Sequence, residues 1–220
     1  MAKKILFVIT SHDKITEEIV TGFWLEELAA PYYAFKEKGY ELTLASPRGG
    51  KVPIDPKSIS GEEELEQAKE VIGKCEDTLP LHEVNTEEYD AIFLPGGHGT
   101  MFDFPENIHL IQAIQSYAAA GKVVAAVCHG PAGLVNVKDQ DGKPLVAGKR
   151  VAAFTDSEEA AVQLVEHMPF LLESRLRELG AQVHTVEDWH PHVEVDGTLV
   201  TGQNPQSSVA VANEVIKLLN

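Results

Sequence analysis

A cysteine followed directly by a histidine is the feature of this sequence with the clearest capacity for chemistry. Cys128 and His129 follow an apolar run at 123–127. A strand, a nucleophile at a sharp turn and a helix start make a nucleophile elbow, and Ala126 and Gly130 are small enough to let the backbone fold tightly there. Because a helix N-terminus favours a thiolate over a thiol, we expect Cys128 to act as a nucleophile with His129 as its base or cationic partner.

Cysteine also packs well as a small buried hydrophobe, so a structural role for Cys128 stays open at this point. The other cysteine, Cys75, lies in a strongly acidic run at 62–76 that we expect to be a solvated helix. Carboxylates there disfavour a thiolate, which indicates Cys128 as the reactive cysteine. A low-pKa, accessible Cys128 would also be prone to oxidation, and this leaves a redox-sensing role open.

A glycine-rich segment at 96–99 follows a second apolar run, at 90–94. Glycines permit close backbone approach, so the N–H groups around Gly97 can face a developing oxyanion beside Cys128. The segment lacks the lysine and the spacing of a phosphate-binding loop. His98, within the segment, is a secondary candidate for lining the pocket.

A carboxylate near the start of an expected helix at 22–38 is the third candidate. Glu26 and Glu27 lie about 100° apart on a helix, so both cannot point inward, and Glu27 is the one beside the apolar stripe. In an isolated amphipathic helix a solvated role is the commoner one for a glutamate. Trp24 is a further secondary candidate for the pocket.

The elements that must position these residues alternate along the chain between strand-length apolar runs and amphipathic helices. This alternation predicts a doubly wound α/β fold with a mostly parallel sheet sandwiched by helices. We expect strands at 4–10, 41–45, 90–94, 122–127, 150–154 and 182–186. We expect helices at 22–38, 108–120, 157–165, 169–179 and 205–219.

The length of 220 residues favours one domain, 1–220. Two segments interrupt the alternation and are expected to be surface insertions that form rims or lids of the site, one near 47–80 and one near 137–148. The second contains several turn-forming residues and is expected to form a hairpin.

The composition disfavours several classes of partner. The net charge of −16 would repel nucleic acids and anionic lipid surfaces. No apolar run approaches the length of a membrane span. Two cysteines that lie far apart make neither a disulfide framework nor a zinc ribbon, so we expect a soluble, cytoplasmic protein.

These pieces together resemble the ThiJ/PfpI superfamily, whose fold is related to type 1 glutamine amidotransferases and is flavodoxin-like. The resemblance is strongest to its branch of heat-shock chaperones and glutathione-independent glyoxalases. The motifs that carry it run in order along nearly the whole chain: Thr21-Gly22, Glu27 with Pro31, Ala45-Ser46-Pro47, Gly97-His98-Gly99-Thr100, Ala126-Val127-Cys128-His129-Gly130-Pro131, Phe154-Thr155-Asp156 and Val200-Thr201-Gly202-Gln203-Asn204-Pro205.

The resemblance implies a role for each site residue. Cys128 would be the nucleophile, His129 its partner and Glu159 the orienting third member, with Asp156 as the runner-up for that third place. Glu27 would contact the cysteine sulfur as acid or base. The N–H groups of Gly97 and His129 would form the oxyanion site. The resemblance further implies a homodimer that uses no cofactor and no metal.

The implied chemistry is the conversion of methylglyoxal or glyoxal to lactate or glycolate. Cys128 would add to the aldehyde as a hemithioacetal, and Glu27 or His129 would move the C1 proton to C2 through an enediol before water releases the product. Protein deglycase or holding-chaperone action, with glycated or unfolded proteins as partners, is the associated possibility.

Four other interpretations remain open. A peptidase or amidase could use the same Cys128 and His129, because the elbow suits acyl transfer equally well. In a glutamine amidotransferase a distant histidine and glutamate, within 189–194, would complete the triad. His190, His192 and Glu194 alternate and could share one face of a strand as metal ligands, although a solvated edge strand or loop accounts for them more simply. A chaperone without catalysis would instead need an exposed apolar patch.

Overall fold

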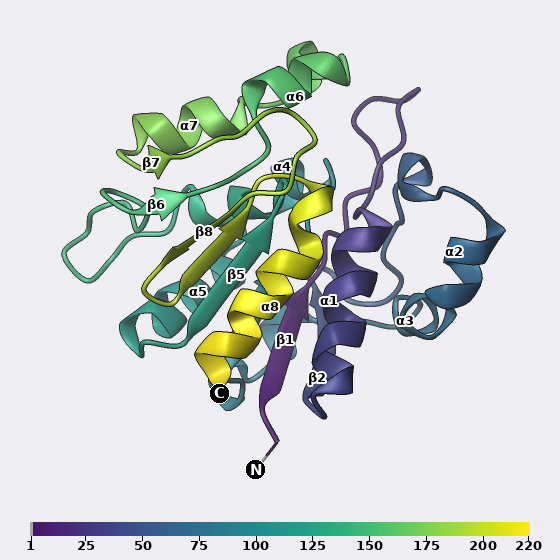
Figure 1. Cartoon of the computed structure of the whole chain (residues 1–220), viewed down its shortest axis with the longest axis horizontal. Helices are drawn as coiled ribbons and strands as arrows, with labels where there is room; N and C mark the ends of the chain where they lie inside the picture. Colours follow the sequence, from purple (N-terminus) through teal and green to yellow (C-terminus); the bar gives the residue numbers. More distant parts are fainter. Residues whose placement is uncertain (1) are drawn as a thin grey trace.

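The computed structural model describes residues 2–220, in which a seven-stranded, mostly parallel sheet is covered by helices on both faces (Figure 1). The strand order is β3-β2-β1-β4-β5-β9-β8, and within this sheet β8 pairs antiparallel to β9. The strands of this sheet are β1 (Lys4–Val8), β2 (Glu41–Ser46), β3 (Leu79–Pro80), β4 (Ala91–Leu94), β5 (Val123–Val127), β8 (Val193–Asp196) and β9 (Leu199–Gly202).

The helices form the outer layers of the sandwich. They are α1 (Leu25–Glu37), α2 (Glu62–Gln67), α3 (Lys69–Lys74), α4 (Thr100–Asp103), α5 (Ile108–Ala119), α6 (Asp156–Ala161), α7 (Leu172–Glu178) and α8 (Ser208–Leu219). Helices α1 and α8 pack side by side on one face, and α5 covers the other (Figure 1). The doubly wound α/β fold expected from the alternation is confirmed.

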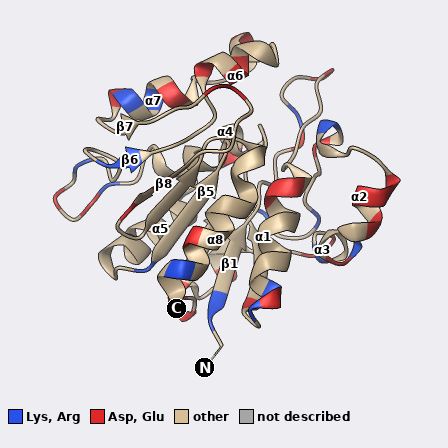
Figure 2. Cartoon of the chain, viewed as in Figure 1, with Lys and Arg blue, Asp and Glu red and all other residues tan. Residues whose placement is uncertain are grey.

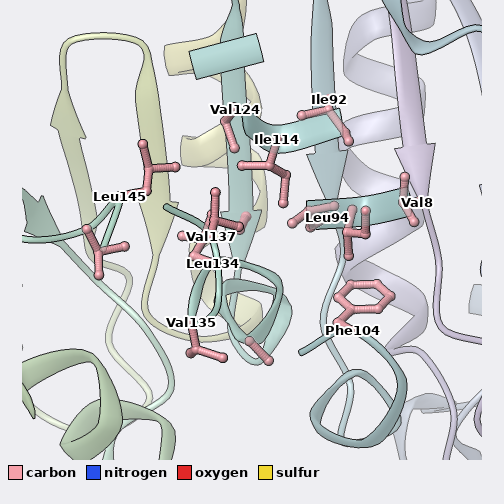
Figure 3. Packing of buried hydrophobic residues seen from close by; sticks show 14 of the residues in the cluster. Val8, Ile92, Leu94, Phe104, Ile114, Val124, Leu134, Val135, Val137 and Leu145 are labelled. Atoms are coloured by element: carbon pink, nitrogen blue, oxygen red, sulfur yellow. The ribbon is translucent and has the colours of Figure 1, made fainter. Parts of the chain in front are cut away.

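The alternation of side chains along each strand divides the core between the two faces. Ile92, Leu94 and Val124 pack with residues of α5 and the following loops (Figure 3). Phe93 and Ala125, one position away, pack instead against α1 and α8. Because both faces are covered, the central strands are apolar at every position.

The order of the strands creates a switch point between β1 and β4. The chain leaves β1 toward β2 on one side and returns to β4 on the other. In doubly wound sheets ligands bind outside the carboxyl ends of the strands at such a point. The segments that follow β1, β4 and β5 contain the sequence-predicted site residues Glu27, Gly97 and Cys128.

Two of the expected strands are wrong in length and place. Only Arg150–Val151 (β6) and Gln182–Val183 (β7) are extended, and they pair with each other in a small separate sheet. The positions beside β5 in the main sheet are occupied by the hairpin of β8 and β9, which the sequence analysis did not predict. The hairpin strands are four residues each and turn at Gly197, whose φ of +61° suits glycine.

The expected helices at 157–165 and 169–179 are also too long. Helix α6 ends at Ala161, and α7 begins at Leu172 rather than at Pro169. Gln163, with a φ of +61°, lies in the left-handed region just after α6, and this turn ends the helix early.

The acidic run near the first insertion is two short helices, and its cysteine is not solvated. Ala68, between α2 and α3, has a ψ of 1° and is not helical, so the expected continuous helix breaks there. The acidic side chains gather on α2 (Figure 2). Cys75, at the end of α3, is buried against the core of the α1 face, so its expected exposure is wrong. The segment then continues into edge strand β3.

The second irregular segment lies far from the expected site. Lys138 and Pro144 form an isolated antiparallel bridge, as in a short hairpin. The segment lines a groove with the last turns of α5 and the β8–β9 turn, next to Val124 at the start of β5. Because Cys128 follows the other end of β5, this segment is not a rim of the Cys128 site. No helix within residues 2–220 is long and apolar enough to cross a membrane.

Candidate active site

Cys128 occupies a strained turn at the carboxyl end of β5. Its φ is +60°, in the left-handed region that non-glycine residues rarely adopt. The turn is fixed on both sides, because the Cys128 N–H donates to the Gly202 carbonyl at 3.0 Å and the Cys128 carbonyl accepts from the Phe154 N–H at 2.9 Å. Gly130 is required two residues later, since a Cβ there would lie 2.2 Å from the Leu94 oxygen. This is the geometry of a nucleophile elbow.

A histidine and a glutamate extend from the sulfur into the core. His129 Nδ1 lies 3.4 Å from Cys128 Sγ, and His129 Nε2 lies 2.7 Å from Glu159 Oε2. The other carboxylate oxygen, Oε1, lies 2.7 Å from His98 Nε2. All four side chains are buried. Two imidazoles therefore share one carboxylate beside the sulfur.

Glu159 is aimed by the start of α6. Thr155 caps this helix in a capping box with Glu158. The Glu158 carboxylate also accepts from the Trp189 N–H and the Asn204 side chain, and this network fixes the first turn. The next residue, Glu159, then points toward His129.

The charges around Glu159 determine the protonation state of His129. Burial raises the pKa of Glu159, but His129 and His98 outweigh it and hold the pKa below its ordinary value. Burial, with His98 beside it, lowers the pKa of His129. An ionised Glu159 takes the hydrogen bond of a neutral His129 at Nε2, which leaves the Nδ1 lone pair facing the thiol.

Glu27 lies on the other side of the sulfur, in the first turn of α1. Its Oε2 accepts the Gly96 N–H at 2.6 Å, and its Oε1 is buried with no hydrogen-bond partner in residues 2–220. Burial raises the pKa of Glu27 to about 8, although the bond from Gly96 and the contact with Cys128 oppose the shift. At neutral pH this carboxyl group is therefore largely protonated.

The expectation of a resting thiolate at Cys128 is wrong. Burial raises the pKa of the Cys128 thiol well above its ordinary value, Glu27 adds to this shift when it is ionised, and the N–H of His129 lowers the pKa only in part. The helix that follows is a single 3₁₀ segment, Gly130–Leu134, too short for a strong dipole. With an exposed fraction of 3%, Cys128 also lacks the accessibility expected of a redox sensor.

The glycine-rich turn after β4 packs tightly against these segments. A Cβ at Gly97, whose φ is +101°, would lie 2.3 Å from the Gly22 oxygen, so only glycine fits. Trp24 donates its N–H to the Gly96 carbonyl at 3.2 Å. Its backbone thus joins α1 to the turn.

Several candidate residues lie away from the sulfur. The Asp156 carboxylate, the runner-up for the third member, accepts from Ser174 at the start of α7, so Glu159 alone of the two contacts His129. His190 is exposed, and its Nδ1 lies near the Asp188 carbonyl. The three residues His190, His192 and Glu194 therefore do not converge as metal ligands or complete a triad with Cys128.

Sequence reasoning missed two groups of contacts. Glu194 lies 3.0 Å from His184 Nδ1 and 3.1 Å from His192 Nε2, so His184, not His190, completes that cluster. The centre of the Phe154 ring lies 4.3 Å from that of the His129 ring and 5.8 Å from that of the Trp189 ring. Neither group has local spacing that signals it, because each joins segments from different elements.

The fold and the site define a doubly wound α/β protein with a buried Cys-His-Glu cluster at the carboxyl edge of its sheet. A model of the DJ-1/PfpI family matches residues 13–218, and the chain belongs to this family.

Relatives in sequence and structure cover nearly the whole chain. Glyoxalase 3 of Candida albicans is 31% identical over 97% of each chain. The glutathione-independent glyoxalase hsp3101 of Schizosaccharomyces pombe is 36% identical over 90% of this chain and 87% of its own. The X-ray structure of the Francisella tularensis Rapid Encystment Protein superposes with a TM-score of 0.92 at 38% identity, covering 99% of each chain.

Proposed function

We propose that this protein is a glutathione-independent glyoxalase that converts methylglyoxal or glyoxal to lactate or glycolate, with Cys128 as its nucleophile. Support comes from the Cys128, His129 and Glu159 geometry and from similarity to proteins that are named glyoxalases. The reaction needs no cofactor, because the substrate itself supplies both the carbon that is oxidised and the carbon that is reduced.

The first step forms a carbon–sulfur bond. His129 Nδ1 accepts the Cys128 thiol proton, and the sulfur attacks the aldehyde carbon C1. Glu27 gives its proton to the aldehyde oxygen, so the product is a neutral hemithioacetal. The N–H groups of Gly97 and His129 are the proposed donors for the developing oxyanion, and the His129 N–H already faces the sulfur.

The second step moves hydrogen from C1 to C2. Glu27, now a carboxylate, removes the C1 proton, and the protonated His129 gives its proton to the C2 oxygen to form an enediol. Glu27 then returns a proton to C2 and takes the proton of the C1 hydroxyl, which leaves a thioester on Cys128. Water attacks this thioester with His129 as base, and the hydroxy acid and the thiol are released.

The observation that carries this proposal is the buried carboxyl group of Glu27 beside the sulfur. A cysteine hydrolase needs only the nucleophile, its histidine and an orienting acid. An isomerisation also needs a group that gives and takes a proton at the substrate carbons. Glu27 has a pKa of about 8 and an oxygen with no hydrogen-bond partner among residues 2–220, which suits that second role.

The burial of the site favours a small substrate over a polypeptide. Cys128 is almost completely buried. The Phe154 ring packs against the His129 ring, and Trp189 packs against Phe154. A two- or three-carbon aldehyde fits such a site more readily than an extended peptide. This argues against the peptidase or amidase interpretation.

The test is methylglyoxal consumption without glutathione, with lactate quantified. We expect one lactate per methylglyoxal from the native protein, and a loss of about 100-fold or more in Glu27→Gln. Glu26→Gln is the matched control, because Glu26 is the exposed neighbour on the same turn. Consumption without lactate, or full activity in Glu27→Gln, would overturn the proposal.

Four wider assignments are also proposals, and two of them, the homodimer and the action on proteins, rest on the resemblance. We infer that residues 1–220 act as one domain, that the protein is a homodimer, and that it works in the cytoplasm, where its two free cysteines stay reduced. Action on glycated or unfolded proteins is a further associated proposal. Size-exclusion chromatography with light scattering tests the dimer, and aggregation assays with Cys128→Ser test whether protein protection needs the catalytic thiol.

A further inference from the structure

The pair of histidines on Glu159 matches a metal-binding group as well as a catalytic one. One ring nitrogen each from His98 and His129 and one Glu159 oxygen all lie within 4.8 Å of one another. Two imidazole nitrogens and a carboxylate are a ligand set that Zn²⁺ takes in proteins. We propose that His98, His129 and Glu159 bind one Zn²⁺ ion and that this ion inhibits the enzyme. The inhibitory part rests on the proposed function.

The geometry requires only small side-chain movements. Each nitrogen now lies 2.7 Å from a Glu159 oxygen. In a tetrahedral zinc site with bonds of about 2.0–2.1 Å, neighbouring ligand atoms lie about 3.3 Å apart. Widening these two nitrogen–oxygen separations needs shifts of about 0.6 Å, and no two of the three ligand atoms lie more than 4.8 Å apart.

The surroundings favour a cation. The buried carboxylate of Glu158 adjoins Glu159 in sequence, and the whole chain has a net charge of −16. The Phe154 ring covers the His129 ring at 4.3 Å and shields one side of the site from water. An apolar shell of this kind around metal ligands limits access of solvent to the ion.

Zinc at this position would stop proton transfer without touching the sulfur. When Nε2 of His129 coordinates the metal, the imidazole proton must stand on Nδ1. Nδ1 is the atom 3.4 Å from Cys128 Sγ, so His129 would then be unable to accept the thiol proton. Inhibition would come from the histidine and not from a zinc–thiolate bond.

The binding test uses zinc alone, in competition with a chromophoric chelator, on the reduced full-length protein without substrate. We expect one zinc per chain, affinity reduced at least about tenfold in His98→Gln, and no such loss in Cys128→Ser. His192→Ala is the control for the histidines around Glu194. Absence of binding to the native protein, or an equal loss in Cys128→Ser, would overturn the site.

Cobalt provides a second measurement that does not depend on variants. Co²⁺ bound to the native protein should show d–d absorption without a sulfur-to-cobalt charge-transfer band, and such a band would overturn the proposed ligands. In turnover assays we expect inhibition by zinc that EDTA reverses, and bound zinc with unchanged turnover would overturn the inhibitory role. Zinc binding is measured without substrate, so a failure of the glyoxalase proposal is seen separately.

Discussion

Cys128 and Cys75 are buried to almost the same degree, with exposed fractions of 3% and 2%, and burial raises the pKa of both thiols. Cys75 ends α3 among apolar neighbours on the α1 face, with the Glu76 charge adding to its shift to about 12. Cys128 stands in a strained turn between His129 and Glu27. Neither burial nor a low thiol pKa distinguishes the proposed catalytic cysteine from Cys75. The two cysteines differ in the proton-carrying side chains beside Cys128.

Replacement of Cys128 has the largest expected effect on turnover, and replacement of Cys75 is the comparison. We predict that Cys128→Ser lowers methylglyoxal turnover by about 1000-fold or more, because a serine hydroxyl is a far weaker nucleophile in the same place. Cys75→Ala should leave the turnover rate unchanged. Steady-state rates and melting curves for both variants make this test. Comparable losses of turnover in the two variants would contradict the different roles assigned to the two cysteines.

The stability of the Cys128 region should depend on pH through Glu27. Its folded pKa of about 8 lies above the ordinary value of 4.5, so the folded state holds this proton longer than the unfolded state. The contribution is fully present below about pH 4.5 and is lost as the pH rises through 8, by about 3–5 kcal/mol. Urea unfolding of native protein and Glu27→Gln from pH 5 to 9 measures it. Parallel pH profiles would contradict a buried protonated Glu27.

The orienting carboxylate should matter at one position only. Glu159→Gln is expected to lower turnover by about 100-fold, because an amide no longer fixes the His129 tautomer whose Nδ1 faces the thiol. Asp156→Asn is the matched control, since that side chain bonds to Ser174 and not to His129. The pH–rate profiles of both variants give the comparison, and a loss confined to Asp156→Asn would reverse the assignment.

The smallest effects distinguish the glycines near the two cysteines. Gly130→Ala should cost about 1–3 kcal/mol of stability, because its Cβ would clash with the Leu94 oxygen at 2.2 Å. Gly73→Ala, in α3 next to Cys75, meets nothing within 4 Å and should stabilise the helix by about 0.5–1 kcal/mol. Chemical denaturation checks both signs, and destabilisation by Gly73→Ala would show that the Cys75 region is packed more tightly than described.

The sequence predicts well those features that adjacent residues encode. The apolar strands β1, β4 and β5 were expected within one or two residues, because burial on both faces leaves an unbroken apolar run. The turn at Cys128 was expected from small neighbours. Strands β8 and β9 were missed because short hairpin strands lack such a run.

Local sequence patterns did not predict the contacts between segments that lie far apart in the chain. The pairing of Glu159 with His98 joins α6 to the turn after β4, and Phe154 reaches His129 from a third segment. The direction of the Cys128 pKa was also wrong, because the helix-dipole argument took no account of complete burial beside Glu27. Side-chain contacts of this kind and the burial that shifts a pKa depend on three-dimensional packing, which the spacing of residues in the sequence does not reveal.

The most direct test of a covalent mechanism at Cys128 is peptide mass spectrometry after rapid acid quenching of the native protein with methylglyoxal. We predict an adduct with the mass of one methylglyoxal on the peptide that contains Cys128, and none on the peptide that contains Cys75. Glu159→Gln should retain the adduct for longer. Lactate production with no adduct on Cys128 at any quench time, or an adduct on Cys75 that forms at the rate of turnover, would contradict the account.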